Sequence, residues 1–366
     1  MLIDIIAGAR PNFVKISPII NALKKAQSGG FDVRYRLIHT GQHYDPKLSG
    51  SFFEQLDIPF PDVNLEVGSG TQAQQTGQIM AKYEQLLLNL PSNYCLVVGD
   101  VNSTLATSIV AKKMGIKIIH VEAGIRSGDL NMPEEINRIV TDAITDYFFT
   151  TTKQAGQNLK NSGISDDRIF FVGNTMIDTL LNQMHKLIEP PFFKQLSLVK
   201  NEYIVLTLHR PSNVDQSENL ISLLKAVVQA SKGMKIIFPV HPRTFKVLSQ
   251  VDFSSEYLNL VEPLSYLEFN YLVKYAKAVI TDSGGVTEET TVMGIPCMTL
   301  RNTTERPETC VIGTNELLGT NPEAIKPAME TLFAGKWKKG SIPEKWDGKT
   351  SERIVIELQK IFAKGL

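Results

Sequence analysis

The chain has 366 residues, and its 38 lysines and arginines balance its 38 aspartates and glutamates, so its formal net charge is zero. A neutral chain argues against a protein that binds nucleic acid or a membrane surface, and no apolar stretch approaches the roughly 20 residues that span a bilayer. The length exceeds that of one ordinary hydrophobic core, so we expect two domains.

Apolar runs of strand length alternate with helical patterns along almost the whole chain. The first run carries Asp4 and no basic segment, so we expect a strand and not a signal peptide. The expected strands are Leu2–Ala7, Val33–Thr40, Tyr94–Gly99, Lys117–Val121, Tyr147–Thr150, Ile169–Val172, Tyr203–Leu208, Lys235–Pro239, Leu258–Val261, Ala278–Thr281 and Pro296–Leu300. The expected helices include Pro11–Ala26, Gln72–Leu90, Asn102–Met114, Pro133–Thr145 and Thr350–Ala363.

Strand–helix alternation is typical of βαβ units, with parallel strands and helices on both faces of the sheet. Two such series predict an α/β fold of two doubly wound, Rossmann-like domains. We place them at residues 1–173 and 174–349, because the pattern breaks between Gly173 and the pair Pro190-Pro191. The pattern allows the last helix, within residues 350–366, to pack on either domain. Two such domains place a ligand cleft at their junction.

The expected helix Pro133–Thr145 has the spacing of one buried apolar face. The face predicted to be buried consists of Ile136, Ile139, Val140, Ala143 and Ile144. The opposite face carries Glu134, Arg138 and Asp142, and we expect these side chains to point away from the core.

Acidic residues stand where buried strands of the first half end or where the next helix starts. Asp100 follows one strand, Glu122 follows the next, and Glu134 opens the helix after it. The carboxyl ends of parallel strands form the ligand crevice of an open sheet, where carboxylates can act as general acid and base. Helix capping is the alternative, and we favour it for Glu135. For the other three acids, their clustering favours a functional site.

The loop after the first strand places two cations at a strand end. Arg10 lies at the tip, Pro11 suits the first helical position, and Lys15 lies about one turn into the helix. Such a helix start can meet a phosphate or the charge of a leaving group. Neither a dinucleotide fingerprint nor a Walker A loop is present. For either cation alone, a solvated surface residue is the alternative.

A glycine-rich turn follows the expected strand Ala278–Thr281. Ser283, Gly284 and Gly285 allow close backbone approach, and the amides of the following helix start can hold a diphosphate. Glu289, about one turn further, can accept hydrogen bonds from ribose hydroxyls. The alternative is a plain turn, because many Gly-Gly pairs have no other role.

Three further residues lie at strand exits of the second half. His209 and His241 end consecutive strands, and Arg301 opens a polar loop. A histidine titrates near neutrality and can donate to phosphate, so we expect a site role for at least one of the two. Structural histidines and simple turn chemistry are the alternatives. The three cysteines lack metal-ligand spacing, so we expect buried thiols in a cytoplasmic protein.

A series of motifs runs in one order over nearly the whole chain. The motifs are Gly8-Ala9-Arg10-Pro11, Gly99-Asp100, His120–Arg126, Pro133–Arg138, His209-Arg210, Thr281–Gly285 and Thr303–Glu308. Together they resemble the non-hydrolysing UDP-N-acetylglucosamine 2-epimerases. The resemblance implies a GT-B-type pair of domains, a homodimer, a UDP-sugar in the cleft, and neither a metal nor a nicotinamide cofactor. It also implies that the C-terminal helix crosses back to the first domain.

Carried over residue by residue, the resemblance implies roles for most candidates. The catalytic residues implied are Asp100, Glu122, Glu134 and His209. The substrate contacts implied are Arg10 and Lys15 as cations, Ser283, Gly284 and Gly285 around the diphosphate, and Glu289 on the ribose. To these we add His241 and Arg301 from their strand-end positions. The implied reaction inverts C2 of the sugar by eliminating UDP to a 2-acetamidoglucal and adding it back.

Some segments depart from the commonest pattern of that family. Asn12 stands where many members have Glu, and Val101 where Thr is frequent. The segments Gly41–Asp45 and Met132–Asn137 look closer to a branch that acts on modified sugars. We therefore expect UDP-GlcNAc or a modified form, such as UDP-2,3-diacetamido-glucuronic acid, to be converted to its ManNAc-type epimer for surface polysaccharide. Alternatives are a hydrolysing epimerase that releases ManNAc and UDP, a GT-B glycosyltransferase, and an inactive UDP-sugar-binding module.

Overall fold

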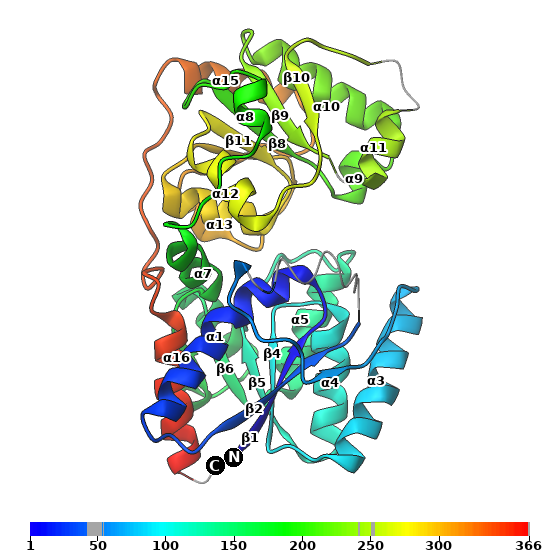
Figure 1. The fold of residues 1–366 in the computed structure, drawn as a ribbon, viewed down its shortest axis with the longest axis vertical. Coiled ribbons are helices and arrows are strands. Elements are labelled where there is room, and N and C mark those ends of the chain that lie inside the picture. Colours follow the sequence, from blue (N-terminus) through cyan, green and yellow to red (C-terminus); the bar gives the residue numbers. More distant parts are fainter. Residues whose placement is uncertain (42–52, 54, 241, 250–252, 365–366) are drawn as a thin grey trace. The chain divides into compact units, whose positions relative to one another are not determined.

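The computed structural model describes residues 1–41, 53, 55–240, 242–249 and 253–364. The chain forms two compact units, one of Met1–Asn182 together with Glu344–Leu366 and one of Gln183–Pro343. Each unit is built on its own parallel sheet with flanking helices, so the predicted α/β fold with two doubly wound domains is confirmed (Figure 1).

The sheet of the first unit has seven strands in the order β3-β2-β1-β4-β5-β6-β7, all parallel. The strands are β1 Leu2–Ala7, β2 Arg34–His39, β3 Val63–Asn64, β4 Tyr94–Val98, β5 Lys117–Val121, β6 Tyr147–Thr150 and β7 Ile169–Phe171. All except β3 match an expected strand to within one residue at each end. Because helices cover both faces of the sheet, every residue of β4 is buried.

The helices of the first unit come from both ends of the chain. They are α1 Arg10–Ser28, α3 Gln72–Asn89, α4 Asn102–Lys113, α5 Pro133–Ile144, α6 Lys153–Asn161, α7 Thr175–Gln183 and α16 Thr350–Ala363. Figure 1 shows α16, at the C-terminal end, lying beside α1 at the N-terminal end. Phe362 of α16 packs on Phe31 and Tyr94, with ring centroids 5.8 and 4.5 Å apart. The last helix therefore completes the core that the first residues begin.

The second unit repeats the architecture with six parallel strands in the order β10-β9-β8-β11-β12-β13. The strands are β8 Tyr203–Thr207, β9 Lys235–Pro239, β10 Leu258–Val261, β11 Ala278–Thr281, β12 Cys297–Thr299 and β13 Asn315–Leu317. The helices are α8 Phe192–Gln195, α9 Pro211–Val214, α10 Ser217–Ala230, α11 Pro242–Leu248, α12 Tyr266–Lys274, α13 Gly284–Met293, α14 Pro307–Val311 and α15 Ile325–Phe333. Ile204, Leu206 and Ile280, from the two central strands, are completely buried in its core.

Helix α7 is fastened to two other helices of the first unit. Pro18 lies inside α1 and has no N–H to give to the carbonyl of Val14, and Thr179 Oγ1 of α7 donates to that oxygen instead, at 2.6 Å. Asp178 caps α16 by accepting from the amides of its first two residues, at 3.0 and 2.7 Å. These bonds explain why the first unit extends to Asn182, whereas the sequence-based boundary was set at residue 173.

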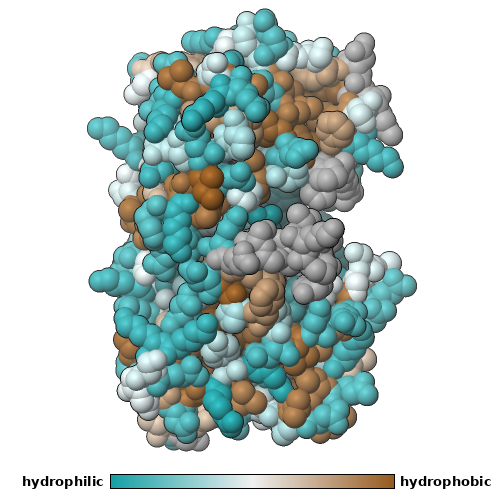
Figure 2. Space-filling model, in the orientation of Figure 1, coloured by the Kyte–Doolittle hydropathy of each residue, from teal (hydrophilic) through white to brown (hydrophobic). Residues whose placement is uncertain are grey.

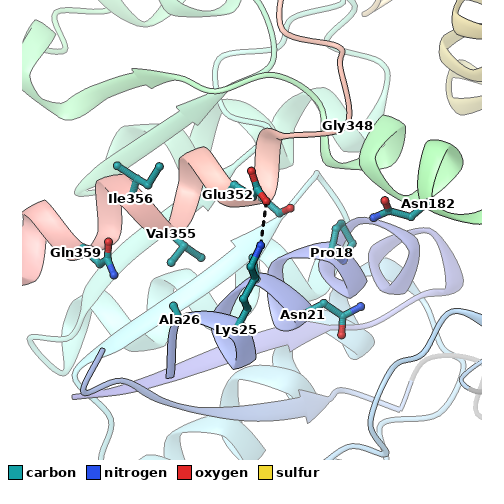
Figure 3. A pocket seen from close by; sticks show the side chains of 12 residues that line it. Pro18, Asn21, Lys25, Ala26, Asn182, Gly348, Glu352, Val355, Ile356 and Gln359 are labelled. Atoms are coloured by element: carbon teal, nitrogen blue, oxygen red, sulfur yellow. Dashed lines mark ion pairs between the residues drawn. The ribbon is translucent and has the colours of Figure 1, made fainter. Parts of the chain in front are cut away.

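An open groove of about 570 Å³ separates α1 from α16 on the surface of the first unit. Figure 3 shows Lys25 of α1 and Glu352 of α16 pointing toward each other across it, with Nζ and Oε1 3.5 Å apart. Both side chains are well exposed, so water screens this pair and it adds little to stability. The docking of α16 depends instead on buried apolar residues such as Ile354, Leu358 and Phe362.

Helix α5 faces the opposite way from the prediction. Ile136, Ile139 and Val140 are exposed, at 47, 39 and 37 %, whereas Arg138 and Asp142 are buried, at 4 and 3 %. The polar residues face inward because each pairs with an opposite charge from outside the helix, Arg138 with Asp100 and Asp142 with Arg126, which offsets the cost of burying it. The expectation that the apolar stripe lines the core and that these charges face solvent was therefore wrong.

The surface carries no continuous apolar belt on the face shown in Figure 2, where hydrophilic residues surround separate groups of apolar ones. Apolar residues scattered in this way are normal for a folded protein. In the part of the chain that the structure describes, no helix has both the length and the apolar character needed to cross a bilayer.

Candidate active site

Both sheets reverse their strand order next to the loops that carry the predicted site residues. In the first unit β1 lies between β2 and β4, and in the second β8 lies between β9 and β11. In open α/β sheets, ligands bind outside the carboxyl ends of the strands at such a switch point. Arg10 is the first residue of α1, directly after the loop that follows β1, and the loops that follow β4, β8 and β11 contain Asp100, His209 and Ser283, respectively.

Lys15 and Glu122 form a buried ion pair in the first unit. Lys15 Nζ lies 2.9 Å from Oε1 and 2.7 Å from Oε2 of Glu122. The backbone of Glu122 has a φ of 73°, a conformation that residues with side chains rarely adopt. Its amide and that of Ala123 donate to the carbonyl of Phe149 in β6 and hold this conformation. Strain of this kind is concentrated at functional sites, where it fixes the direction of a side chain.

Arg138 of α5 joins two carboxylates of the first unit. Its Nη2 and Nε lie 2.6 and 2.9 Å from Oδ2 of Asp100, and its Nη1 lies 2.7 Å from Oε2 of Glu135. Burial opposes ionisation of Glu135, but donors on Ser127, Arg138 and Gly128 hold the pKa of Glu135 below its ordinary value. Glu135 therefore orients Arg138, and Arg138 in turn positions Asp100, which stays partly exposed.

A second buried network joins β5 to α5. His120 places Nδ1 2.8 Å from Oδ1 of Asp142 and Nε2 2.9 Å from the carbonyl of Gly99, and Arg126 Nη1 lies 2.7 Å from Oδ2 of Asp142. Burial opposes ionisation of Asp142, but His120 and then Arg126 hold the pKa of Asp142 below its ordinary value. The network anchors the backbone next to Asp100. Sequence reasoning missed it because it placed Asp142 on the surface.

The other predicted residues of the first unit are less enclosed. Gly99 has a φ of 71°, a conformation that favours glycine, and a Cβ there would lie 3.2 Å from Lys15 Nζ, so a side chain at residue 99 would be strained and would push this ammonium aside. Arg10 begins α1 with an exposed side chain. Glu134, in the first turn of α5, is half-buried, and its side chain forms no hydrogen bond or ion pair with another described residue.

His209 and Asp282 form the central pair of the second unit. His209 Nδ1 lies 2.8 Å from Oδ1 of the fully buried Asp282, which also accepts from the amide of Arg210 and from Nδ2 of Asn213. Burial opposes ionisation of Asp282, but His209 and these donors hold the pKa of Asp282 below its ordinary value. Sequence reasoning gave Asp282 no role. Its place directly after a buried strand was the available signal, the same one that singled out the acids of the first unit.

The glycine-rich turn opens α13, as predicted. Ser283 precedes the helix without capping it through its side chain, and Gly284 and Gly285 are its first two residues. A Cβ on Gly284 would lie 2.6 Å from Oε1 of Glu305, so the loop after β12 packs tightly on this turn. Arg301 pairs with Glu305, with Nη2 2.6 Å from Oε2, and is itself buried. The amides of the first helical turn have no intrahelical partner, which suits them to an anion.

Two adjacent acids of α13 have different surroundings. Glu288 pairs with Arg306, whose Nε lies 2.7 Å from Oε1. Glu289 is buried and accepts from Tyr266 Oη at 2.8 Å and from Asn270 Nδ2 at 3.5 Å. Burial raises the pKa of Glu289 to about 7, against the opposing effect of these two hydrogen bonds. Glu289 is thus a carboxyl group that changes charge near neutral pH, a property common at functional sites.

The remaining candidate, His241, lies outside the described residues. In the described ranges, no group of three or more His, Cys, Asp or Glu side chains is arranged to hold a metal ion. Cys95 and Cys297 are buried free thiols, and Cys310 is a partly exposed one.

Comparisons with known proteins agree with this architecture. A family model described as UDP-N-acetylglucosamine 2-epimerase matches residues 24–359. The chain is 42% identical to the UDP-N-acetylglucosamine 2-epimerase of Methanocaldococcus jannaschii, over 97% of this chain and 98% of that one. It is 36% identical to the UDP-2,3-diacetamido-2,3-dideoxy-D-glucuronate 2-epimerase of Pseudomonas aeruginosa, over 99% of this chain and 100% of that one. The crystal structure of M. jannaschii UDP-GlcNAc 2-epimerase in complex with UDP-GlcNAc and UDP matches with a TM-score of 0.88 at 41% identity, covering 98% of this chain and 100% of that one.

Proposed function

The chain belongs to the UDP-N-acetylglucosamine 2-epimerase family and is an epimerase, and from this premise we propose that it inverts C2 of a UDP-N-acetylhexosamine without hydrolysing it. In the proposed reaction a carboxylate takes the proton from C2 and the bond from C1 to UDP breaks, which gives a 2-acetamidoglucal. UDP then adds back to C1 while a proton returns to the opposite face of C2. The proton that leaves C2 is replaced by one that returns to C2, and the UDP that leaves C1 adds back to C1, so no other reactant is consumed.

The observation that carries this proposal is the pair of carboxylates at the ends of β4 and β5, each held by its own cation. Asp100 is held by Arg138, and Glu122 by Lys15. The C2 proton is weakly acidic and needs a positioned base, and the proton that returns to the other face needs an acid. Glu134 is a third candidate for these proton transfers, because no described cation pairs with it.

The second unit supports the binding of the UDP part. The first amides of α13, at Gly284 and Gly285, and the exposed ring of His209 can face the charge of a diphosphate. Glu289 can accept hydrogen bonds from ribose hydroxyls. Arg10, and His241 and Arg301 of the second unit, are further substrate contacts in the proposal.

We take UDP-GlcNAc and UDP-ManNAc as the first pair to test, because the archaeal relative at 42% identity is named for UDP-N-acetylglucosamine. A modified sugar such as UDP-2,3-diacetamido-glucuronic acid is the second, because of the relative at 36% identity. We also propose a cytoplasmic homodimer that supplies precursors of surface polysaccharide. Ile136, Ile139 and Val140 of α5 support self-association, because an exposed apolar stripe is stabilised by covering it.

The test is incubation of these UDP-sugars with the protein in deuterated water, followed by NMR. Deuterium should appear at C2 of both epimers without release of free UDP. Asp100→Asn and Glu122→Gln should each abolish exchange, whereas Glu84→Gln, a change to an exposed acid on α3, should not. Absence of exchange with every sugar contradicts the proposal. Stoichiometric release of ManNAc and UDP would instead identify a hydrolysing enzyme.

A further inference from the structure

The two strands at the switch point of the second sheet bring Asp282 and His209 together. β8 and β11 pair in parallel with Thr207 opposite Thr281, and the hydroxyls of these two threonines lie 2.6 Å apart. The residues that follow each strand therefore leave the sheet side by side. Asp282 is the next residue after β11, and its carboxylate lies beneath the loop that begins at His209.

The carboxylate of Asp282 is surrounded by N–H donors. The amide of His209 lies 3.1 Å from each oxygen, the amide of Arg210 lies 2.9 Å from Oδ2, and Nδ2 of Asn213 lies 3.0 Å from Oδ2. These donors favour the ionised form, which can only accept hydrogen bonds. The contact of 2.8 Å between Oδ1 and Nδ1 of His209 therefore requires a proton on Nδ1.

A proton fixed on Nδ1 leaves Nε2 as the ring atom that gains and loses a proton. The side chain of His209 is 53 % exposed although Asp282 is completely buried, so the ring is open to a ligand. We propose that Asp282 is a positioning residue, which keeps His209 in the Nδ1–H tautomer and presents Nε2 to the diphosphate of the bound nucleotide sugar. The identity of that ligand rests on the proposed function, whereas the tautomer does not.

The tautomer matters for the departure and return of UDP. When the bond from C1 to the phosphate oxygen breaks, the electron pair goes to that oxygen, and a protonated His209 can donate Nε2–H to it. When UDP adds back, the proton returns to Nε2 and the ring regains its starting state. In the opposite tautomer, Nδ1 would accept a hydrogen bond instead of donating one, and the neutral ring would carry its proton on Nε2. Nε2 could then not take the proton back from UDP.

The Asp282→Asn variant tests this assignment with little change in shape. The amide that it introduces can donate to Nδ1 and hold the neutral ring in the opposite tautomer. In a serine-protease triad, the corresponding change lowers kcat by about 10⁴-fold. His209 is proposed here to stabilise a leaving group and not to activate a nucleophile, so we expect a loss in kcat of about 10²–10³-fold, with a much smaller change in KM.

The tautomer can be measured without substrate. The chain has six histidines, so selective labelling of histidine with ¹⁵N gives few signals, and loss of one in His209→Gln assigns that residue. The neutral ring of His209 should carry its proton on Nδ1 in the parent and on Nε2 in Asp282→Asn. A parent ring with the proton on Nε2 overturns the inference, even if C2 exchange is observed. A confirmed tautomer without any C2 exchange would instead contradict only the proposed function.

A double-mutant cycle separates positioning from a purely structural role. If Asp282 acts through His209, Asp282→Asn should lower kcat less than about 3-fold further in the His209→Gln background. A structural role predicts the same loss in both backgrounds and overturns the inference. Glu218→Gln, a change to an exposed acid on α10, is the control and should keep the Nδ1–H tautomer and the activity. If Asp282→Asn does not fold, the NMR measurement of the His209 tautomer in the parent protein tests the inference by itself.

Discussion

Replacing Lys15 with methionine should destabilise the first unit, because it leaves the carboxylate of Glu122 buried without its cation. Nζ and Oε2 lie 2.7 Å apart, and the two side chains are 10 % and 4 % exposed. At an effective dielectric constant of about 20, two unit charges at this distance attract by about 6 kcal/mol. Desolvation offsets part of that attraction, and removing one partner of a buried pair costs about 3–5 kcal/mol. We expect the free energy of unfolding of the first unit at pH 8 to fall by that amount.

The two tryptophans allow each unit to be followed separately. Trp346 is buried in the first unit and Trp337 belongs to the second, so in a Trp337→Phe background the fluorescence of Trp346 reports urea unfolding of the first unit. Adding Glu122→Gln to Lys15→Met replaces the buried carboxylate that has lost this cation and should restore most of the lost stability, but not C2 exchange. An unchanged midpoint in Lys15→Met would refute the reasoning. So would a double variant as unstable as the single one.

Three further predictions concern other parts of the chain. Burial raises the pKa of Glu289 from 4.5 to about 7. The free energy of unfolding of the second unit should therefore fall by roughly 3 kcal/mol as the pH rises from 4.5 to about 7. Glu289→Gln should remove this pH dependence when unfolding is followed by the fluorescence of Trp337. Arg36 holds the fully buried Asp4 with two bonds of 2.8 Å, so Arg36→Met should cost the first unit about 3–5 kcal/mol in urea unfolding, and a loss below 1 kcal/mol would contradict this. Ile139→Asp should convert a dimer to a monomer in light scattering with little change in melting temperature; a monomeric parent would show that α5 is not a self-association surface.

The strands and the five helices that were expected from the sequence lie within two residues of their expected bounds. β3 and β13 have two and three residues, too few for any alternation, and were not expected. Helix α5 was located correctly, but the face that it buries was not. Its apolar spacing was read correctly, but periodicity alone cannot say which face is buried when the polar face finds charged partners elsewhere in the fold.

Some residues of the candidate site could also be chosen from the sequence, because they follow the predicted strands. Acids and glycines that follow buried strands mark one edge of a parallel sheet, so Asp100, Glu122 and Ser283 could be chosen from the pattern. Their partners come from elements distant in sequence, as Arg138 does for Asp100, and no local signal specifies such a pairing. The φ of 73° at Glu122 is likewise imposed by neighbouring strands, since its own residue type disfavours it.

The division of the first unit into two segments has a consequence for synthesis. The ribosome delivers the whole of the second unit before it delivers α16, the helix that Asp178 caps and that covers one side of α1. Domains generally fold as they emerge, N-terminal ones first, but here the N-terminal domain has to wait for the last residues of the chain. A nascent or truncated chain that stops before Glu344 therefore carries a second unit with all its residues and a first unit with apolar surface exposed. Chaperones and proteases would meet that surface first.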